Sequence, residues 1–305
     1  MIDSEKIKAK SRELGFSDCG IAEAQPLDLA GKLEKWLGGS FHGNMEYMER
    51  NPEKRLDPSK LFAGARSVIV LAAPYYTQKY KPQGNLKISR YASGRDYHRV
   101  LKKMGQKLID WFGEEYGKNN SRVFVDTAPL LEKEWARMAG LGWLGKNTCL
   151  ILPGKGSWFF LALILTDLEL RADKPETREF CGNCTKCIDA CPTNAISREG
   201  YIDSRKCISY LTIESRNQIP GSFAGKTDNW LFGCDICQEV CPHNRFAIET
   251  NIVDFLPRPS SIKIESREVL ALNEDDFKKK FAGSPLKRAG LNKLKMTVSF
   301  LLPDV

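Results

Sequence analysis

Eight of the ten cysteines in this chain fall between residues 181 and 241, close enough together to bind metal. The first run reads Cys181-x2-Cys184-x2-Cys187-x3-Cys191-Pro192. In bacterial ferredoxins, three cysteines of such a run hold one 4Fe-4S cluster and the fourth binds the other cluster. Paired C-x2-C motifs also build zinc sites, so zinc is the competing interpretation. Four cysteines this close, ending in Cys-Pro, favour iron–sulfur clusters.

A second run reads Cys234-x2-Cys237-x3-Cys241-Pro242 and lacks one ligand, because Leu231 occupies the equivalent position. Cys207 is the one cysteine of the region left to complete the count. Exchanging the fourth ligands between the runs gives two full sets. The first set is Cys181, Cys184, Cys187 and Cys241, and the second is Cys191, Cys207, Cys234 and Cys237. We therefore predict two 4Fe-4S clusters.

A disulfide framework is the alternative for a cysteine-rich segment. The first residues show no basic region leading into an apolar stretch, so we expect no secretory signal, and reducing compartments keep thiols free. The longest apolar run, residues 158–165, is far shorter than the roughly 20 residues of a membrane helix. We expect a cytoplasmic protein with no membrane span. The formal charge of +8 permits contact with nucleic acid but does not demand it.

Three other motifs are weaker evidence for a binding or reactive site. The stretch 140–146 resembles dinucleotide and phosphate loops, but a helix precedes it where those motifs need a strand, so a helix end with a tight loop is the simpler interpretation. Asp96-Tyr97-His98 opens like a cobalamin motif, but Leu101 replaces its glycine, which argues against a histidine ligand to cobalt. Cys19 and Cys149 are best explained as small buried side chains.

The elements that must position these residues alternate along the chain. Hydrophobic spacing predicts helices at 4–14, 97–116 and 130–139, and strands at 68–73, 123–125 and 157–165. This mixture favours an α+β or α/β core. A charged stretch at 171–179 marks a boundary. We predict a domain at 1–175, a cysteine domain at 176–245 and a basic segment at 246–305 that packs on the body.

Seven blocks of the sequence together resemble the epoxyqueuosine reductase family. They are HGNMEYM (42–48), EKR (53–55), RYASGRDYH (90–98), VDTAP with Glu132-Lys133 (125–133), AGLGWLGKNT (139–148), GSWFF (156–160) and GCDICQEVCP (233–242). The resemblance runs from about residue 5 to the end of the chain. It implies an α+β protein in which a corrinoid-binding α/β domain resembling reductive dehalogenases precedes a two-cluster bacterial-ferredoxin-like domain.

The implied activity is the last step of queuosine biosynthesis, the cobalamin-dependent reduction of epoxyqueuosine in the tRNA anticodon loop. Cobalamin itself is implied by the resemblance alone. The resemblance assigns the catalytic acid to Asp126, which ends a strand just before a proline turn; an N-cap for the next helix is the alternative role. By the same resemblance the corrinoid contacts are Arg55, Tyr97, Asp126, Lys146, Asn147, Thr148 and Asp235.

Longer members of the family carry a helical-repeat extension, whereas this sequence stops at Val305. We therefore expect the basic tail to contact tRNA through Lys287, Arg288, Lys293 and Lys295. We also expect a monomer served by a low-potential electron donor. Two alternatives remain: a reductive dehalogenase-like corrinoid enzyme, which typically carries an export signal, and a non-catalytic electron carrier, which would not need the first 175 residues.

Overall fold

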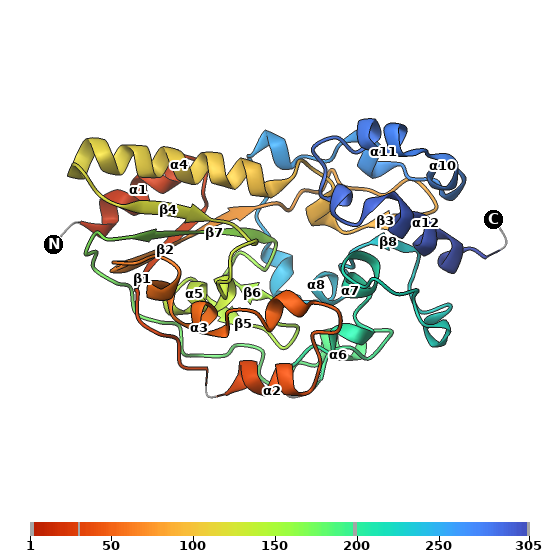
Figure 1. The fold of residues 1–305 in the computed structure, drawn as a ribbon, viewed down its shortest axis with the longest axis horizontal. Helices are drawn as coiled ribbons and strands as arrows, with labels where there is room; N and C mark the ends of the chain where they lie inside the picture. The colour runs from red at the N-terminus through yellow and green to blue at the C-terminus, as the bar shows by residue number, and fades with distance from the viewer. Residues whose placement is uncertain (1–2, 30, 198–199, 304–305) are drawn as a thin grey trace.

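A four-stranded antiparallel sheet forms the centre of the N-terminal half of the protein (Figure 1). The structure is a computed structural model, and it describes residues 3–29, 31–197 and 200–303. The strands are β1 (Asp18–Glu23), β2 (Ser67–Pro74), β7 (Phe159–Thr166) and β4 (Ser121–Phe124), in the order β1-β2-β7-β4. Every residue of β2 is buried, because this strand pairs with neighbours on both sides. The three predicted strands are confirmed.

Helices cover both faces of this sheet. Helices α1 (Ser4–Glu13) and α4 (Tyr97–Tyr116) lie on one face, and α5 (Glu132–Met138) lies on the other (Figure 1). The side chains of β2 alternate accordingly: Ile69 and Leu71 pack in the core with α1 and α4, whereas Val68 and Val70 pack in the core with α5. The predicted helices are confirmed, and an antiparallel sheet of this kind makes the fold α+β.

The glycine-rich stretch after α5 is a helix end followed by a hairpin, not a phosphate loop. Gly140 has φ 73°, in the left-handed region that terminates helices. A Cβ at Gly142 would lie 2.0 Å from the Ile151 carbonyl oxygen, so only glycine fits there. The short strands β5 (Trp143–Leu144) and β6 (Leu150–Ile151) then pair as an antiparallel hairpin. The loop between them carries Lys146, Asn147 and Thr148 to the cysteine segment.

The cysteine segment consists of short elements packed beside the sheet (Figure 1). Its strand β8 (Trp230–Phe232) pairs in parallel with β3 (Lys87–Ile88), which joins the segment to the N-terminal half. The other elements are α6 (Lys186–Asp189), η4 (Ser204–Lys206), α7 (Ile208–Ile213), η5 (Gly221–Phe223), α8 (Ile236–Glu239) and η6 (Pro242–Phe246).

The C-terminal segment is helical and shares a core with both preceding parts. Leu86 and Ile88 from the N-terminal half, Phe232 from the cysteine segment, and Phe281 and Leu294 from the C-terminal segment belong to one buried cluster. The segment therefore packs on the body as predicted, while the three domain limits remain predictions. Its elements are η7 (Val253–Phe255), α9 (Pro259–Ile262), α10 (Ser266–Ala271), α11 (Glu274–Lys280), η8 (Pro285–Arg288) and α12 (Gly290–Leu301).

The remaining elements lie between the strands in sequence. They are α2 (Lys32–Gly38), η1 (Glu46–Met48), α3 (Pro52–Leu56), η2 (Pro58–Lys60) and η3 (Arg90–Ala92). Across the described ranges, no helix has the length and apolar character needed to cross a membrane.

Candidate active site and cluster centres

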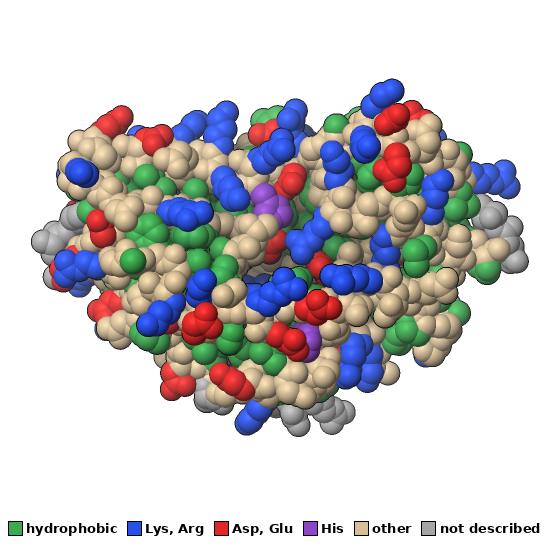
Figure 2. Space-filling model, viewed as in Figure 1, with side chains coloured by type: hydrophobic (Ala, Val, Ile, Leu, Met, Phe, Trp, Pro, Cys, Tyr) green, Lys and Arg blue, Asp and Glu red, His purple; other side chains and the backbone are tan. Residues whose placement is uncertain are grey.

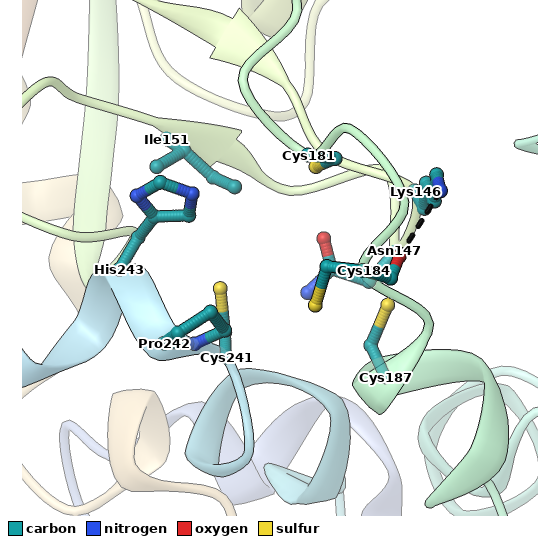
Figure 3. Close-up of a pocket in the computed structure, with 9 residues that line it drawn as sticks. All are labelled: Lys146, Asn147, Ile151, Cys181, Cys184, Cys187, Cys241, Pro242 and His243. Carbon is teal, nitrogen blue, oxygen red and sulfur yellow. Dashed lines mark hydrogen bonds between the residues drawn. The ribbon is translucent and has the colours of Figure 1, made fainter.

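The four cysteines of the first predicted set line one pocket, with Figure 3 showing sulfur atoms from both cysteine runs around a common space. Cys181, Cys184 and Cys187 come from the loop before α6 and from α6 itself, and Cys241 comes from the end of α8 on the other side. The sequence folds this way because each run closes with a short helix ending at Cys-Pro. The structure thus brings together the set that the crossed assignment predicts.

The cysteines of the second predicted set lie near one another in the interior. Burial raises the pKa of the Cys234 thiol, and the nearby Cys207 and Cys191 raise it further. The pKa of Cys207 is raised by burial and by Cys191, against the effect of backbone N–H groups at the start of α7. The pKa of Cys237 is raised by a hydrogen bond with Cys149, by burial and by charges on Cys234 and Cys207. These mutual effects are those of a four-thiol cluster site.

The arrangement fits clusters better than zinc. A zinc ion needs four ligand atoms within about 2.3 Å of one point. In the part of the chain that the structure describes, no three His, Cys, Asp or Glu side chains are arranged around a single ion. Cys181, Cys184, Cys187 and Cys241 instead line a common pocket. Four thiolates around one pocket suit a four-iron cubane, because each thiolate binds a different iron.

The first set is the outer one and the second set the inner one. Phe180, Gly182 and Lys186, which flank the first cysteines, are exposed. Ile208 and Asp235, which flank cysteines of the second set, are buried. Electrons arriving from another molecule would therefore reach the first set before the second.

Two of the predicted corrinoid contacts, Lys146 and Asn147, use their polar atoms within the protein. Lys146 Nζ donates to the carbonyls of Gly182 at 2.7 Å and Cys184 at 3.0 Å. Asn147 is 3% exposed and donates to the Cys237 carbonyl at 3.2 Å. These bonds fix the hairpin loop onto both cysteine sets. As corrinoid contacts, Lys146 and Asn147 remain predictions that their hydrogen bonds do not support.

Asp235 joins the cysteine segment to the N-terminal half. Its buried carboxylate accepts hydrogen bonds from the Ser89 hydroxyl and, at 2.7 Å, from the Arg90 backbone N–H. Burial raises the pKa of Asp235 to about 6. Thr148, the third predicted contact in the hairpin loop, has φ 59° and its carbonyl accepts from Lys133 Nζ at 3.1 Å. Neither residue directs a polar group at a cofactor in this geometry.

Asp126 lies in a loop after β4, and one of its carboxylate oxygens is shared by three donors. Oδ2 accepts from the Tyr97 hydroxyl at 3.0 Å and from His98 Nε2 at 3.1 Å, both in the first turn of α4. Arg288 Nη1 lies 3.4 Å from the same oxygen. The Asp126 side chain is 39% exposed. The N-cap of α5 is Leu131, so the alternative role of Asp126 as that N-cap is wrong.

The resting proton of this site sits on His98. Burial lowers the pKa of His98, but hydrogen bonds to Asp126 and Asp96 outweigh it and raise this pKa to about 9. Burial raises the pKa of Asp126, yet His98, Tyr97 and the charge of Arg288 together hold it below its usual range. At neutral pH the pair is therefore an imidazolium beside a carboxylate.

Glu132 stabilises the loop that contains Asp126 through a hydrogen bond to the backbone. Its Oε1 accepts the backbone N–H of Asp126, which itself adopts a left-handed φ of 56°. Burial raises the pKa of Glu132 to about 8, and the charge of Asp126 adds to the rise. Glu132 therefore stays protonated at neutral pH and holds the strained turn without adding a second negative charge.

Arg55 and Tyr97 border the same region with groups that suit a ligand. Arg55 is 6% exposed and donates to the Tyr47 carbonyl, but its Nε has no partner among the described residues. A buried donor without a partner costs roughly 1–3 kcal/mol unless a ligand satisfies it. Tyr97 stacks between Phe160, at 4.3 Å between ring centroids, and His98, at 4.2 Å. Of these two predicted corrinoid contacts, Arg55 offers the donor that suits a cofactor rich in amide acceptors, whereas the Tyr97 hydroxyl already donates to Asp126.

The predicted RNA contacts of the tail separate into two groups. Lys287 is exposed and Lys295 is half-buried. Lys293 is only 9% exposed and donates to the Asn217 carbonyl at 3.1 Å, so its prediction as a phosphate contact is wrong. Arg288 is bonded to Asp126 and, at 2.6 Å, to Glu214. It therefore lies in the Asp126 site instead of on the open surface.

Sequence reasoning missed His98, Glu132 and Arg288 as members of this site. The signal for His98 was present, because Asp96 precedes it by two residues in a helix N-terminus, but it was weighed only as a cobalt ligand. Glu132 was visible only as part of a family block. Arg288 lies 162 residues from Asp126, and local sequence offers no signal for such a pairing.

Comparison with known proteins adds independent findings. A family model described as "Epoxyqueuosine reductase QueG, DUF1730" matches residues 55–127, and a "4Fe-4S double cluster binding domain" matches residues 180–244. An epoxyqueuosine reductase of Cellulophaga algicola is 46% identical over 299 residues, covering 98% of this chain and 97% of that protein. An epoxyqueuosine reductase of Pseudomonas aeruginosa is 41% identical over 293 residues, covering 94% of this chain and 81% of the relative.

Solved structures of epoxyqueuosine reductases have the same fold as this chain. An epoxyqueuosine reductase crystallised with a tRNA-Tyr epoxyqueuosine-modified stem loop has a TM-score of 0.90 at 29% identity, over 98% of this chain and 80% of that chain. The Bacillus subtilis epoxyqueuosine reductase, solved with its Asp catalytic loop swung out of the active site, has a TM-score of 0.87 at 27% identity and the same coverage. A reductive dehalogenase has a TM-score of 0.50 at 19% identity, over 82% of this chain and 32% of its own, a likeness of fold alone. The predicted fold class is confirmed.

Proposed function

This chain belongs to the epoxyqueuosine reductase family, and from that premise we propose that it reduces epoxyqueuosine to queuosine in the tRNA anticodon loop. The protein is an oxidoreductase with a 4Fe-4S double cluster domain. Removing the epoxide oxygen to leave an alkene consumes two electrons and two protons and releases one water. The chain must therefore hold an electron supply and a proton supply at one place.

The observation that supports this function most strongly is the proton-loaded pair of Asp126 and His98. An epoxide that opens under reduction develops negative charge on its oxygen, and a positioned acid must neutralise it. Asp126 is 39% exposed, and His98 at 3.1 Å carries the proton. We infer that Asp126 relays a proton from His98 to the epoxide oxygen.

The electron supply is the crossed pair of cysteine sets. The outer set of Cys181, Cys184, Cys187 and Cys241 would receive electrons one at a time from a low-potential donor. The inner set of Cys191, Cys207, Cys234 and Cys237 would pass them toward Asp126. Cys207 precedes α7 directly, and Glu214 at the other end of α7 is bonded to Arg288 of the Asp126 site. The inner set therefore lies on the same side of the molecule as the acid.

Cobalamin is the cofactor that the family implies between these two supplies. When bound, it supplies a cobalt centre that stores two low-potential electrons and delivers them to carbon. We propose that Arg55 and Tyr97 border it, since the Arg55 Nε lacks a partner among the described residues and the Tyr97 ring is held in a stack beside Asp126. The role of Asp126 here is to orient the proton, and that of Tyr97 is to fix Asp126.

The surface around this site suits an RNA. Figure 2 shows a hollow near the middle of one face, with Lys and Arg side chains crowding its rim beside Asp, Glu and a histidine. We propose that the anticodon loop inserts at this hollow while cationic side chains contact the phosphates. From the tail, Lys287 and Lys295 serve this role. We further propose a cytoplasmic monomer served by a separate electron-donor protein.

The two alternatives are weaker on specific grounds. A non-catalytic electron carrier has no use for a buried Glu132 and a protonated His98 arranged around an exposed carboxylate. A reductive dehalogenase shares the fold at 19% identity, whereas the epoxyqueuosine reductases match at 46% over nearly the whole chain.

Complementation tests the function. A bacterial strain that lacks its own reductase accumulates epoxyqueuosine in its tRNA, and the digested nucleosides can be weighed by mass spectrometry. We expect expression of this chain to convert that nucleoside into queuosine, one oxygen atom lighter. The variants Asp126→Asn and Cys184→Ala, expressed at equal level, should leave epoxyqueuosine in place. Unchanged epoxyqueuosine with the wild-type chain, present in soluble form and containing iron, would reject the proposal.

A further inference from the structure

We propose that Arg288 is a positioning residue that holds the Asp126 loop in its working place by bridging Asp126 to Glu214. The C-terminal segment thereby completes the active site and does not serve only as an RNA-binding tail. This inference rests on the proposed function, because it assigns Arg288 a role in the same reaction. Arg288 acts through Asp126 and is not itself placed on the substrate.

The anchor of Arg288 is rigid, although its guanidinium is 44% exposed. It ends η8, whose first turn is capped by Ser284 and whose Pro285 and Leu286 are buried in the C-terminal core. A guanidinium presents its donors in a fixed planar fork. From this base, Nη2 contacts Glu214 Oε1 at 2.6 Å and Nη1 contacts Asp126 Oδ2 at 3.4 Å.

The bridge joins three parts of the chain that are distant in sequence. Asp126 belongs to the loop after β4, Glu214 caps the C-terminus of α7, and Arg288 lies in the C-terminal segment. The other two donors to Asp126, Tyr97 and His98, both come from the first turn of α4. Arg288 is therefore the one side-chain donor to Asp126, among the described residues, that comes from outside α4.

The shared use of one oxygen gives the bridge a chemical consequence. Within the described ranges, all the side-chain donors to Asp126 contact Oδ2, and no hydrogen bond is formed by Oδ1. Fixing Oδ2 from two sides orients Oδ1 toward the substrate. Loss of Arg288 would let the carboxylate rotate or leave, as an epoxyqueuosine reductase relative solved with its catalytic loop swung out illustrates.

The first test needs no reaction. Hydrogen exchange is measured by mass spectrometry on peptides that cover residues 124–131, in cluster-loaded wild-type protein and in Arg288→Gln. Lys279→Gln, an exposed lysine of the same segment, is the control for charge loss. We expect Arg288→Gln to speed exchange of the Asp126 loop by about threefold or more, and Lys279→Gln to leave it unchanged, because local opening sets exchange rates. Equal protection in Arg288→Gln would overturn the proposal. Glu214→Gln removes the other end of the bridge and should act in the same direction with smaller effect.

The second test separates positioning from general stability. Arg288→Gln should lower single-turnover reduction by about 10-fold or more, yet add little loss on top of Asp126→Asn, because both act through one carboxylate. The variant should also move the high-pH limb of the rate profile upward, since His98 holds the proton of the His98–Asp126 pair and removing a nearby cation makes that proton harder to lose. The other groups facing Asp126 are Tyr97, His98 with Asp96, Glu132, and the more distant Tyr47 and Glu214. These remain in both Arg288 variants, so Arg288→Lys should reverse part of the shift.

The positioning role would be overturned if the rate losses of Arg288→Gln and Asp126→Asn were additive in the double variant. It would also be overturned if the high-pH limb of the rate profile stayed in place in Arg288→Gln. If the wild-type protein reduces no epoxyqueuosine at all, the proposed function fails, while the exchange measurement still decides whether Arg288 holds the loop.

Discussion

Asp126 shares its Oδ2 with Tyr97, His98 and Arg288, and this sharing determines when the residue can act as an acid. Three donors stabilise the carboxylate, so the residue is ionised at rest and the proton waits on His98, with a pKa of about 9. We therefore expect Asp126 to act as an acid only after it has taken a proton from His98.

Replacing Asp126 with Asn tests the acid directly. The amide keeps the shape and accepts the same hydrogen bonds but holds no transferable proton, so we expect single-turnover reduction to fall by about 100-fold or more. Iron content and the visible spectrum should match the wild type. Asp110→Asn, on the remote part of α4, should keep full activity. A normal rate in Asp126→Asn would remove this residue from the chemistry.

Glu132 predicts a pH-dependent stability. Its pKa is about 8 in the folded protein against about 4.5 when unfolded, so the fold favours the protonated form. That stabilisation is complete below the unfolded pKa and is lost as pH rises toward 8, at no more than about 1.4 kcal/mol per pH unit. Glu132→Gln cannot ionise and keeps an acceptor for Asp126. Its apparent Tm should therefore exceed that of the wild type by a margin that widens from pH 6 to pH 8.5; a constant margin would contradict the buried-acid account.

Sequence predicted single residues unevenly. The two cysteine sets were predicted from spacing, which is a local signal, whereas Asp126 was assigned by the family resemblance. The exchange of proton between His98 and Asp126 was not found, because it depends on a 3.1 Å contact between α4 and a loop 28 residues away. Lys293 was misassigned because a lysine in a basic stretch gives no sign that the fold will bury it.

The ligands of the inner set come from different short elements of the cysteine segment. Cys207 precedes α7 and Cys191 follows α6, and only the packing of these elements brings them to Cys234 and Cys237. A change in one element should therefore affect one cluster and spare the other.

Cys207→Ala tests this division. The wild-type protein should contain about eight iron atoms per chain, and the variant about four, because only the inner set loses a ligand. Cys19→Ala, which removes a cysteine outside both sets, should keep all of them. Full iron content and an unchanged reduced EPR spectrum in Cys207→Ala would show that the inner set is composed differently.

Among the helices and strands, those with a regular amphipathic pattern were predicted well, and those with a short or interrupted pattern were missed. Helix 97–116 was predicted to its observed limits, because its apolar side chains recur at helical spacing over twenty residues. Strand β1 was missed since Gly20 interrupts its pattern; the glycine is there because a Cβ would lie 2.2 Å from the Ala139 carbonyl oxygen. The C-terminal helices were missed because most are four to seven residues long and are stabilised by the shared core.

For the whole molecule, we propose an electron route through the two cysteine sets and a proton route through His98 and Asp126. The outer cysteines lie beside the exposed Phe180 and Lys186, while the Asp126 side chain is 39% exposed. The C-terminal segment packs against both halves and contributes Arg288. Separate surfaces for the electron donor and the RNA would let both be bound at once.

RNA affinity should depend on the two accessible tail lysines. In the double variant Lys287→Gln with Lys295→Gln, we expect the slope of log affinity against log salt to fall by about one to two units, because fewer counterions are released. Lys293→Gln should leave the slope unchanged, since that lysine is buried against Asn217. Titrations of an anticodon stem loop at several salt concentrations give these slopes. Equal slopes for the double variant and the wild type would show that the two lysines do not contact RNA phosphates and only keep the protein soluble.

The central claim, that this chain uses two clusters and cobalamin to deoxygenate epoxyqueuosine in tRNA, is tested most directly by a single-turnover reaction with purified components. Anaerobic protein that contains about eight iron atoms is incubated with cobalamin, a chemical reductant and epoxyqueuosine-containing tRNA in less than stoichiometric amount, and the digested nucleosides are weighed. We predict complete conversion to queuosine that requires both cobalamin and reductant. Intact epoxyqueuosine after prolonged incubation of the fully loaded protein would contradict the account.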